Sequence, residues 1–204
     1  MARAPEIPAA ALASIASQIG SRLPSLRAPG AAAMAQAPQI SIGESFPVYM
    51  LGVDALRGGN RNLTEVVRQT GVWQHQIRYG AQAQGIARST APPPGAAPGA
   101  AGWQVQEVVH SPAAPRIDEA IAWIDTHVPQ DAVASILLVP AFYLTAFWLH
   151  EPDRDQVVIA DMPPRLGDLQ PLQLYAADEF LGKLAALQPI SGVPTGQPPP
   201  GRAP

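Results

Sequence analysis

Residues 135–161 read SILLVPAFYLTAFWLHEPDRDQVVIAD and contain the longest mainly apolar run of the chain. The run from Ser135 to Leu149 is 15 residues long, whereas a membrane-spanning helix needs about 20. Pro140 lies inside the run, and a proline inside a helix costs roughly 3 kcal/mol. Its β-branched and aromatic residues favour strands. We therefore predict core strands here, with a buried helix and membrane insertion as the less favoured alternatives.

The stretch divides into two strands, a charged turn and a returning strand, over Ile136–Val139, Phe142–His150, Glu151–Asp155 and Gln156–Asp161. Both faces of the second strand are mainly apolar, which is typical of a central strand covered on two sides. One face carries Phe142, Leu144, Ala146 and Trp148; the other carries Tyr143, Thr145, Phe147 and Leu149. Either a helix or loop covers the second face, or Tyr143, Phe147 and Leu149 form an exposed patch that binds a partner.

The composition narrows the class of protein. A chain of 204 residues suits one domain of ordinary size. Its net charge of −3 and pI of about 5.7 provide no overall attraction to nucleic acid. The absence of cysteine excludes disulfides, thiolate nucleophiles and cysteine–metal sites. We expect a cytoplasmic protein with no transmembrane segment and no nucleic-acid partner.

Proline, glycine and alanine gather in three parts of the chain, which sets the expected boundaries. Residues 1–40 are expected to be a mobile leader, within which Ala9–Leu23 can form a short amphipathic helix. Export, targeting or membrane association through this leader are the alternatives. Residues 41–190 are expected to form a single domain with a Pro/Gly-rich surface loop at 91–102. Residues 191–204 are predicted to be a disordered tail.

The periodicity of residues 41–190 predicts about six strands and three short helices. Asn62 is expected to cap a helix over Leu63–Thr70 that ends at Gly71. Further helices are expected over Arg116–Val128 and Ala176–Leu187. Besides those named above, strands are expected over Ser45–Leu51, Val72–Tyr79, Gln82–Thr90 and Trp103–His110. The hairpins predict an α+β fold: a mainly antiparallel sheet of about five or six strands, with two or three helices packed on one face.

Motifs that carry known chemistry are absent from the sequence. It has no P-loop, no G-x-G-x-x-G, no G-x-S-x-G and no H-E-x-x-H. No two of its four histidines stand at i, i+4, so we predict neither a metal site nor a cofactor. The densest polar cluster is the turn at His150. A functional interpretation makes His150 a general base beside Glu151 or Asp153, but a solvated turn is the favoured interpretation.

Glutamines on the predicted strands suggest a neutral polar sheet surface, formed by Gln74, Gln76, Arg78, Gln104 and Gln106. Such a surface can hydrogen-bond a partner chain, although an ordinary hydrated sheet face is the favoured interpretation. Our first hypothesis is a non-enzymatic protein-binding or assembly module, or a homo-oligomer, that uses this surface or the apolar patch. The alternative is a small hydrolase, lyase or isomerase with a site between sheet and helices, built from His75, His150, Asp54 and Asp161.

Overall fold

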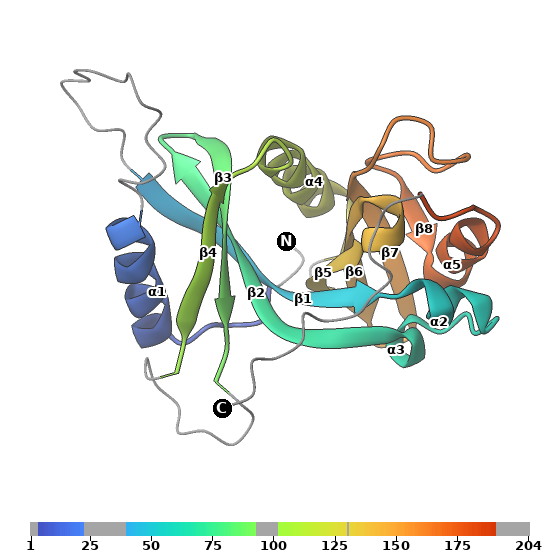
Figure 1. Cartoon of the computed structure of the whole chain (residues 1–204), viewed down its shortest axis with the longest axis horizontal. Coiled ribbons are helices and arrows are strands. Elements are labelled where there is room, and N and C mark those ends of the chain that lie inside the picture. Colours follow the sequence, from blue (N-terminus) through green and yellow to red (C-terminus); the bar gives the residue numbers. More distant parts are fainter. Residues whose placement is uncertain (1–3, 23–39, 93–101, 130, 191–204) are drawn as a thin grey trace.

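The computed structural model describes residues 4–22, 40–92, 102–129 and 131–190. These residues form one mixed eight-stranded sheet and five α-helices (Figure 1). The helices are α1 (Ala9–Arg22), α2 (Val53–Arg57), α3 (Leu63–Val66), α4 (Ala114–His127) and α5 (Ala177–Ala185). The strands are β1 (Ile40–Leu51), β2 (Val67–Tyr79), β3 (Gln82–Thr90), β4 (Gln104–His110), β5 (Val133–Val139), β6 (Leu144–Glu151), β7 (Arg154–Asp161) and β8 (Leu174–Ala176).

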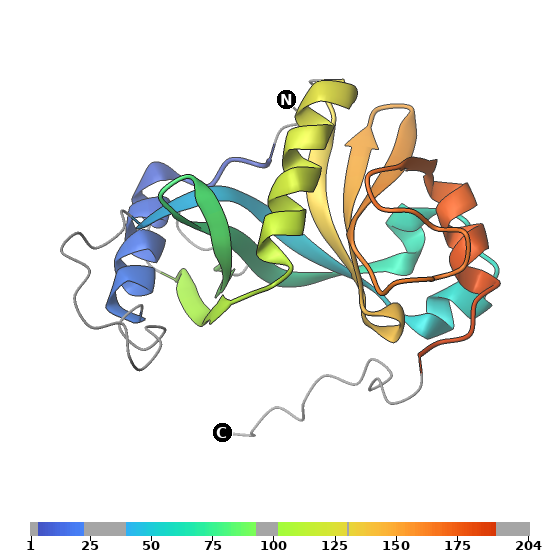
Figure 2. The same cartoon turned by 90° about the horizontal axis from the view of Figure 1, so that it is seen from above.

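The sheet has the strand order β4-β3-β2-β1-β5-β6-β7-β8. Every neighbouring pair is antiparallel except β1 and β5, which run parallel. β1 pairs with β2 along its whole length, but it meets β5 only at Val48, Tyr49 and Met50. The sheet therefore has two wings, β4-β3-β2-β1 and β5-β6-β7-β8, joined through the second half of β1 (Figure 2).

Helices cover both faces of the sheet, which corrects the expected packing on one face. α4 packs on the face that carries Phe46, Val48, Phe147 and Leu149. α1 and α5 cover the opposite face at the two ends of the sheet, α1 over Ile77 and Val105 and α5 over the face of Trp148. The α+β class is confirmed, while the sheet is larger and more mixed than the sequence predicts.

The two apolar faces of β6 are confirmed and both are core. On one face Trp148 meets Tyr49 edge-on, with ring centroids 5.0 Å apart. On the other, Phe147 and Leu149 are completely buried beneath α4. The predicted exposed patch is therefore wrong at these two residues. Tyr143 alone is exposed, at 58%, because it follows the short 3-10 turn Pro140–Phe142 instead of lying in the strand.

The predicted helix over Leu63–Thr70 is too long. Asn62 caps α3 as predicted, since its side chain accepts a hydrogen bond from the Thr64 N–H. The helix ends at Val66, and β2 begins at the next residue and pairs with the end of β1. β-branched valines at this point favour the strand. Gly71 lies within β2 at φ 72°, beside a shift in the pairing register of β1 and β2, and it does not end a helix.

Two further segments are more ordered than the sequence predicts. α2 at Val53–Arg57 and β8 at Leu174–Ala176 are elements that the sequence does not predict. The amphipathic helix expected near the N-terminus is present as α1, with Ala11, Ile15 and Ile19 buried against the sheet. α1 is thus part of the folded body, whereas we expect a mobile leader from its sequence. Among the described residues, no helix is long and apolar enough to cross a membrane.

The expected surface loop and tail fall mainly outside the described ranges. Residues 93–101 of the predicted loop and all of residues 191–204 belong to the parts that the structure does not describe. The strands on either side of these residues, β3 and β4, pair with each other. The pairing extends from Gly85 opposite His110 to Thr90 opposite Gln104.

Candidate functional site

The first half of β1 has a strand neighbour on one edge only. Residues 40–47 pair with β2, and pairing with β5 begins at Val48. In the part of the chain that the structure describes, no strand pairs with the other edge of residues 40–47. Such an edge presents unpaired backbone N–H and C=O groups and is a template for another strand. Pro47, which lacks an N–H, lies at the end of this edge, where proline is tolerated.

An apolar groove runs between this edge and α1. We name it the edge groove; it has a volume of about 470 Å³ and is lined by Leu12, Ala13, Ala16, Ile19, Gly20 and residues 40–43. None of these residues is charged. Ile40 is one of three large hydrophobic residues exposed in the described ranges, at 37%. Ile42 packs against the cluster beneath α1. The groove thus combines an apolar floor with an unpaired backbone edge.

A β-bulge interrupts the free edge just beyond the groove. The pairing of β1 with β2 shifts register between Ile42 and Ser45. Gly43 stands at this shift, and a Cβ atom there would lie only 2.9 Å from Arg78 Nε. A larger residue would have to displace the Arg78 side chain, so glycine leaves room for the guanidinium. Bulges of this kind limit how far another strand can pair along an edge.

The predicted glutamine surface is split between the core and the exterior. Gln74 and Gln76 are each only 1% exposed, so the expectation of a wet face is wrong for them. Gln104 and Gln106 are exposed on the edge strand β4. Gln106 donates to the Thr90 hydroxyl at 3.2 Å. Because these residues do not form one accessible surface, their role in binding a partner remains a prediction.

Arg78 belongs to a half-buried charge cluster with Glu44 and Asp118. Its guanidinium lies 3.0 Å from a Glu44 oxygen and also contacts Asp118 on α4. Burial raises the pKa of the Asp118 carboxyl above its ordinary value, and the Arg78 charge opposes that rise. The cluster ties α4 to the first wing. Several side-chain atoms of β2 and β3 are buried without a hydrogen-bond partner among the described residues, namely Gln74 Nε2, both amide atoms of Gln76, Arg78 Nε and Arg88 Nε.

His75 is a buried structural histidine. Its Nδ1 lies 2.8 Å from the Ser45 hydroxyl and its Nε2 lies 2.7 Å from the Ser89 hydroxyl. Burial lowers the pKa of the imidazole to about 4. The ring is therefore neutral near pH 7, so one serine donates and the other accepts. With both nitrogens occupied and no exposed surface, His75 has no free position for a substrate.

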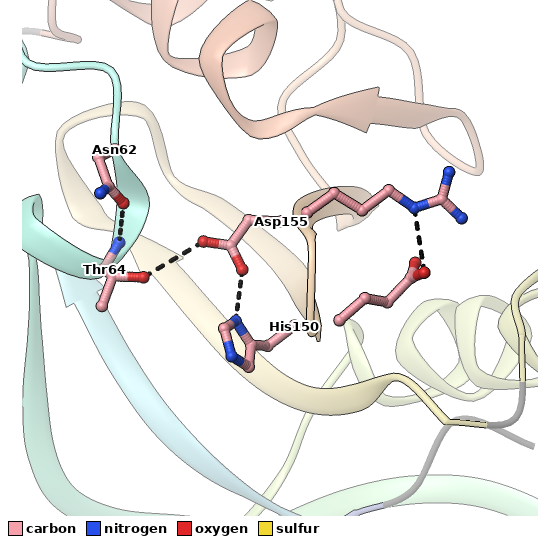
Figure 3. Close-up of polar contacts among 6 residues, drawn as sticks. Asn62, Thr64, His150 and Asp155 are labelled. Atoms are coloured by element: carbon pink, nitrogen blue, oxygen red, sulfur yellow. Dashed lines mark hydrogen bonds and ion pairs between the residues drawn. The ribbon is translucent and has the colours of Figure 1, made fainter.

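His150 and Asp155 form the exposed His–carboxylate pair of the β6–β7 hairpin (Figure 3). His150 Nδ1 lies 2.6 Å from one Asp155 oxygen, and the Thr64 hydroxyl donates to the other at 3.3 Å. Asn62 and Thr64 belong to the α3 cap, so the pair connects the hairpin to α3. The neighbouring residues predicted as partners of His150 do not fill that role, because Glu151 pairs with Arg154 at 3.0 Å.

A polar pocket of about 550 Å³ adjoins this pair. Asp155 lines it together with residues of α3 and the start of α5, but His150 does not. The His150 side chain is 56% exposed, whereas that of Asp155 is 14% exposed. A carboxylate that orients an imidazole is present, yet the imidazole is exposed and does not line the pocket. Acid–base catalysis needs the imidazole within reach of a bound substrate.

The four residues of the predicted catalytic set do not converge. Asp54 is exposed on α2 and lies 3.6 Å from Arg57. Asp161 contacts Arg116 at the end of β7. His75 and His150 lie in different wings with the partners given above. No group of three or more histidine, aspartate or glutamate side chains in the described ranges is arranged to hold a metal ion.

The edge groove escaped the sequence-based prediction. The sequence predicts α1 from its periodicity, but it predicts a strand only from Ser45, whereas β1 begins at Ile40. No local pattern reveals that β5 pairs with only three residues of β1. Comparisons with known proteins add no candidate: no protein-family model matches the chain, and no curated protein or solved structure shows significant similarity to it.

Proposed function

We propose that this chain is a non-enzymatic protein-binding module, which accepts an extended apolar segment of a partner protein as an added strand at the edge groove. The observation that carries the proposal is the unpaired edge of Ile40–Ile42 beside the uncharged floor of the groove. Strand addition satisfies the backbone groups of both chains, and pockets for alternate side chains supply specificity. No charged or catalytic group is needed for this mode of binding.

The lining of the groove defines the partner's chemistry. A strand laid along β1 directs every second side chain towards Leu12 and Ile19 of α1. Apolar side chains fit there, because an unpaired charge buried among these residues would be costly. The bulge at Gly43 limits pairing to a short segment. The partner segment therefore makes a short contact with β1 and not an extended sheet-to-sheet interface.

The test is a peptide-display selection against the full chain, followed by affinity measurements on groove variants. Ala16 is exposed and lines the groove, so Ala16→Glu places a charge there without disturbing the core. Ala10→Glu makes the same change on an exposed part of α1 outside the groove. We expect selected peptides to alternate apolar and polar residues, and to bind Ala16→Glu at least roughly tenfold more weakly, about 1.4 kcal/mol, while Ala10→Glu binds like the wild type.

Equal binding of the peptides to both variants would contradict the proposal. Self-association of the wild type, abolished by Ala16→Glu and detected by sedimentation, would instead identify a second copy of the chain as the occupant. Capture of an unidentified protein from a lysate does not decide between these outcomes.

A second candidate function rests on the His150–Asp155 pair. We propose a small hydrolase, lyase or isomerase as the alternative, with His150 as a general base oriented by Asp155 at 2.6 Å. A hydrolase screen with p-nitrophenyl esters tests the simplest form of it. Activity that disappears in both His150→Gln and Asp155→Asn would favour the enzyme, and activity retained in both variants would exclude this pair.

A further inference from the structure

The connection between β7 and β8 forms a pocket that the proposed binding function does not use. The pocket has a volume of about 530 Å³, within the range of small-molecule sites. Its charged lining residues are Arg116, from the first turns of α4, and Asp161 and Arg165 of the connection. The remaining walls are mainly apolar and include Met162, Pro163 and Leu169. We propose that this pocket binds a small organic monoanion: a carboxylate with an apolar body.

Arg165 is the residue that points most directly to a ligand. It adopts φ 67°, a left-handed conformation that costs a non-glycine residue roughly 1–2 kcal/mol. Glycine would adopt it without steric cost. Arg165 has no hydrogen bond or ion pair within the described residues. The arginine side chain at position 165 therefore makes no polar interaction within the described residues that would stabilise the fold.

The charges of the pocket select a monoanion. Arg116 contacts Asp161, so one positive charge is already balanced. The guanidinium of Arg165 leaves the lining with a net charge of +1. A planar carboxylate matches the fork of guanidinium donors. A dianion would meet the nearby Asp161 carboxylate, and a neutral ligand would leave Arg165 unpaired.

The connection is held in place before any ligand binds. Leu166 and Leu169 are buried, and Leu172 N–H donates to the Ile159 carbonyl at 3.0 Å. The Tyr175 hydroxyl accepts from the Gln170 N–H at 2.7 Å. Prolines at 163, 164 and 171 restrict the backbone further. A preorganised loop pays little ordering cost on binding, so a small ligand can bind measurably.

Titration of the isotopically labelled full chain with benzoate, followed by ¹H–¹⁵N correlation spectra, tests the proposal. We expect saturable shifts at the amides of Met162, Arg165 and Gln170, with a dissociation constant of roughly 1 mM or below. Benzamide, the neutral analogue, should bind at least tenfold more weakly. Arg165→Gly should also weaken benzoate binding at least tenfold without lowering Tm, because glycine accepts the positive φ.

Arg57→Gly is the matched control, since Arg57 is an exposed arginine that does not line the pocket. It should bind benzoate like the wild type. Absence of saturable shifts, or unchanged benzoate affinity in Arg165→Gly, would overturn the proposal. Tighter binding of inorganic phosphate than of benzoate would overturn the assignment to organic carboxylates. All these results are independent of peptide binding at the edge groove.

Discussion

Phe147 packs edge-on against Phe46, with ring centroids 5.1 Å apart, in the core beneath α4. This contact joins β6 to β1 across β5, which lies between them in the sheet. It accounts for the apolar face of β6 that carries Phe147. The second face of β6 is sealed by a helix, so the surface available for binding lies elsewhere.

Replacement of Phe147 should damage stability and not merely binding. We expect Phe147→Ala to lower the free energy of unfolding by about 3–5 kcal/mol, because it leaves a cavity in a fully buried site. Tyr143→Ala, at an exposed position, should change it by less than about 0.5 kcal/mol. Urea unfolding measures both. A folded Phe147→Glu protein of wild-type stability would show that this face is not core.

His75 should make stability depend on pH. Its pKa is about 4 in the folded chain against 6.5 in the unfolded chain, so the unfolded chain binds the extra proton between these values. Stability is therefore lost as pH falls below 6.5, by about 2 kcal/mol between pH 8 and pH 5. Urea unfolding at both pH values measures this, and His75→Gln should lack that part of the loss. An equal loss in the variant would contradict the assignment.

We expect the Gln76 side chain to lower the stability of the folded chain. Both of its side-chain amide atoms are buried without a partner. We expect Gln76→Met, which has a similar shape, to raise the free energy of unfolding by about 1–2 kcal/mol by removing this desolvation cost. Gln106→Met, at an exposed position, is the control and should be nearly neutral. A destabilised Gln76→Met protein would show that the amide is hydrogen-bonded in solution.

The Asn62 cap should stabilise α3 and, through Thr64, the β6–β7 hairpin. Asn62→Ala should cost about 1 kcal/mol, because the Thr64 N–H loses its acceptor. Asn62→Asp keeps an acceptor at the same position and should stay near the wild type. Thermal unfolding compares the two. Equal Tm values for the alanine and aspartate variants would indicate that the capping bond contributes nothing.

Most helices and strands can be predicted from local sequence patterns. Alternation of apolar and polar residues predicts β4, the long apolar run with its charged turn predicts the β6–β7 hairpin, and the apolar stripe predicts α4. The main error in the predicted boundaries is the end of α3. Pairing of Val67 with β1 outweighs its helical propensity there. The candidate binding and catalytic sites are much harder to predict from the sequence. His150 pairs with Asp155 across a hairpin, and Arg165 lines the same pocket as Arg116, which belongs to α4.

The sequence by itself determines that residues 135–161 contain core strands and a hairpin, that β6 is apolar on both faces and that Asn62 starts a helix, because these features depend on neighbours within a few residues. The tertiary structure decides what covers each face, since burial depends on packing between elements far apart in the chain. It places α4 over Phe147 and Gln74 in the interior, and it lets β5 pair with only three residues of β1. The unpaired edge beside α1 follows from that partial pairing, which no local pattern records.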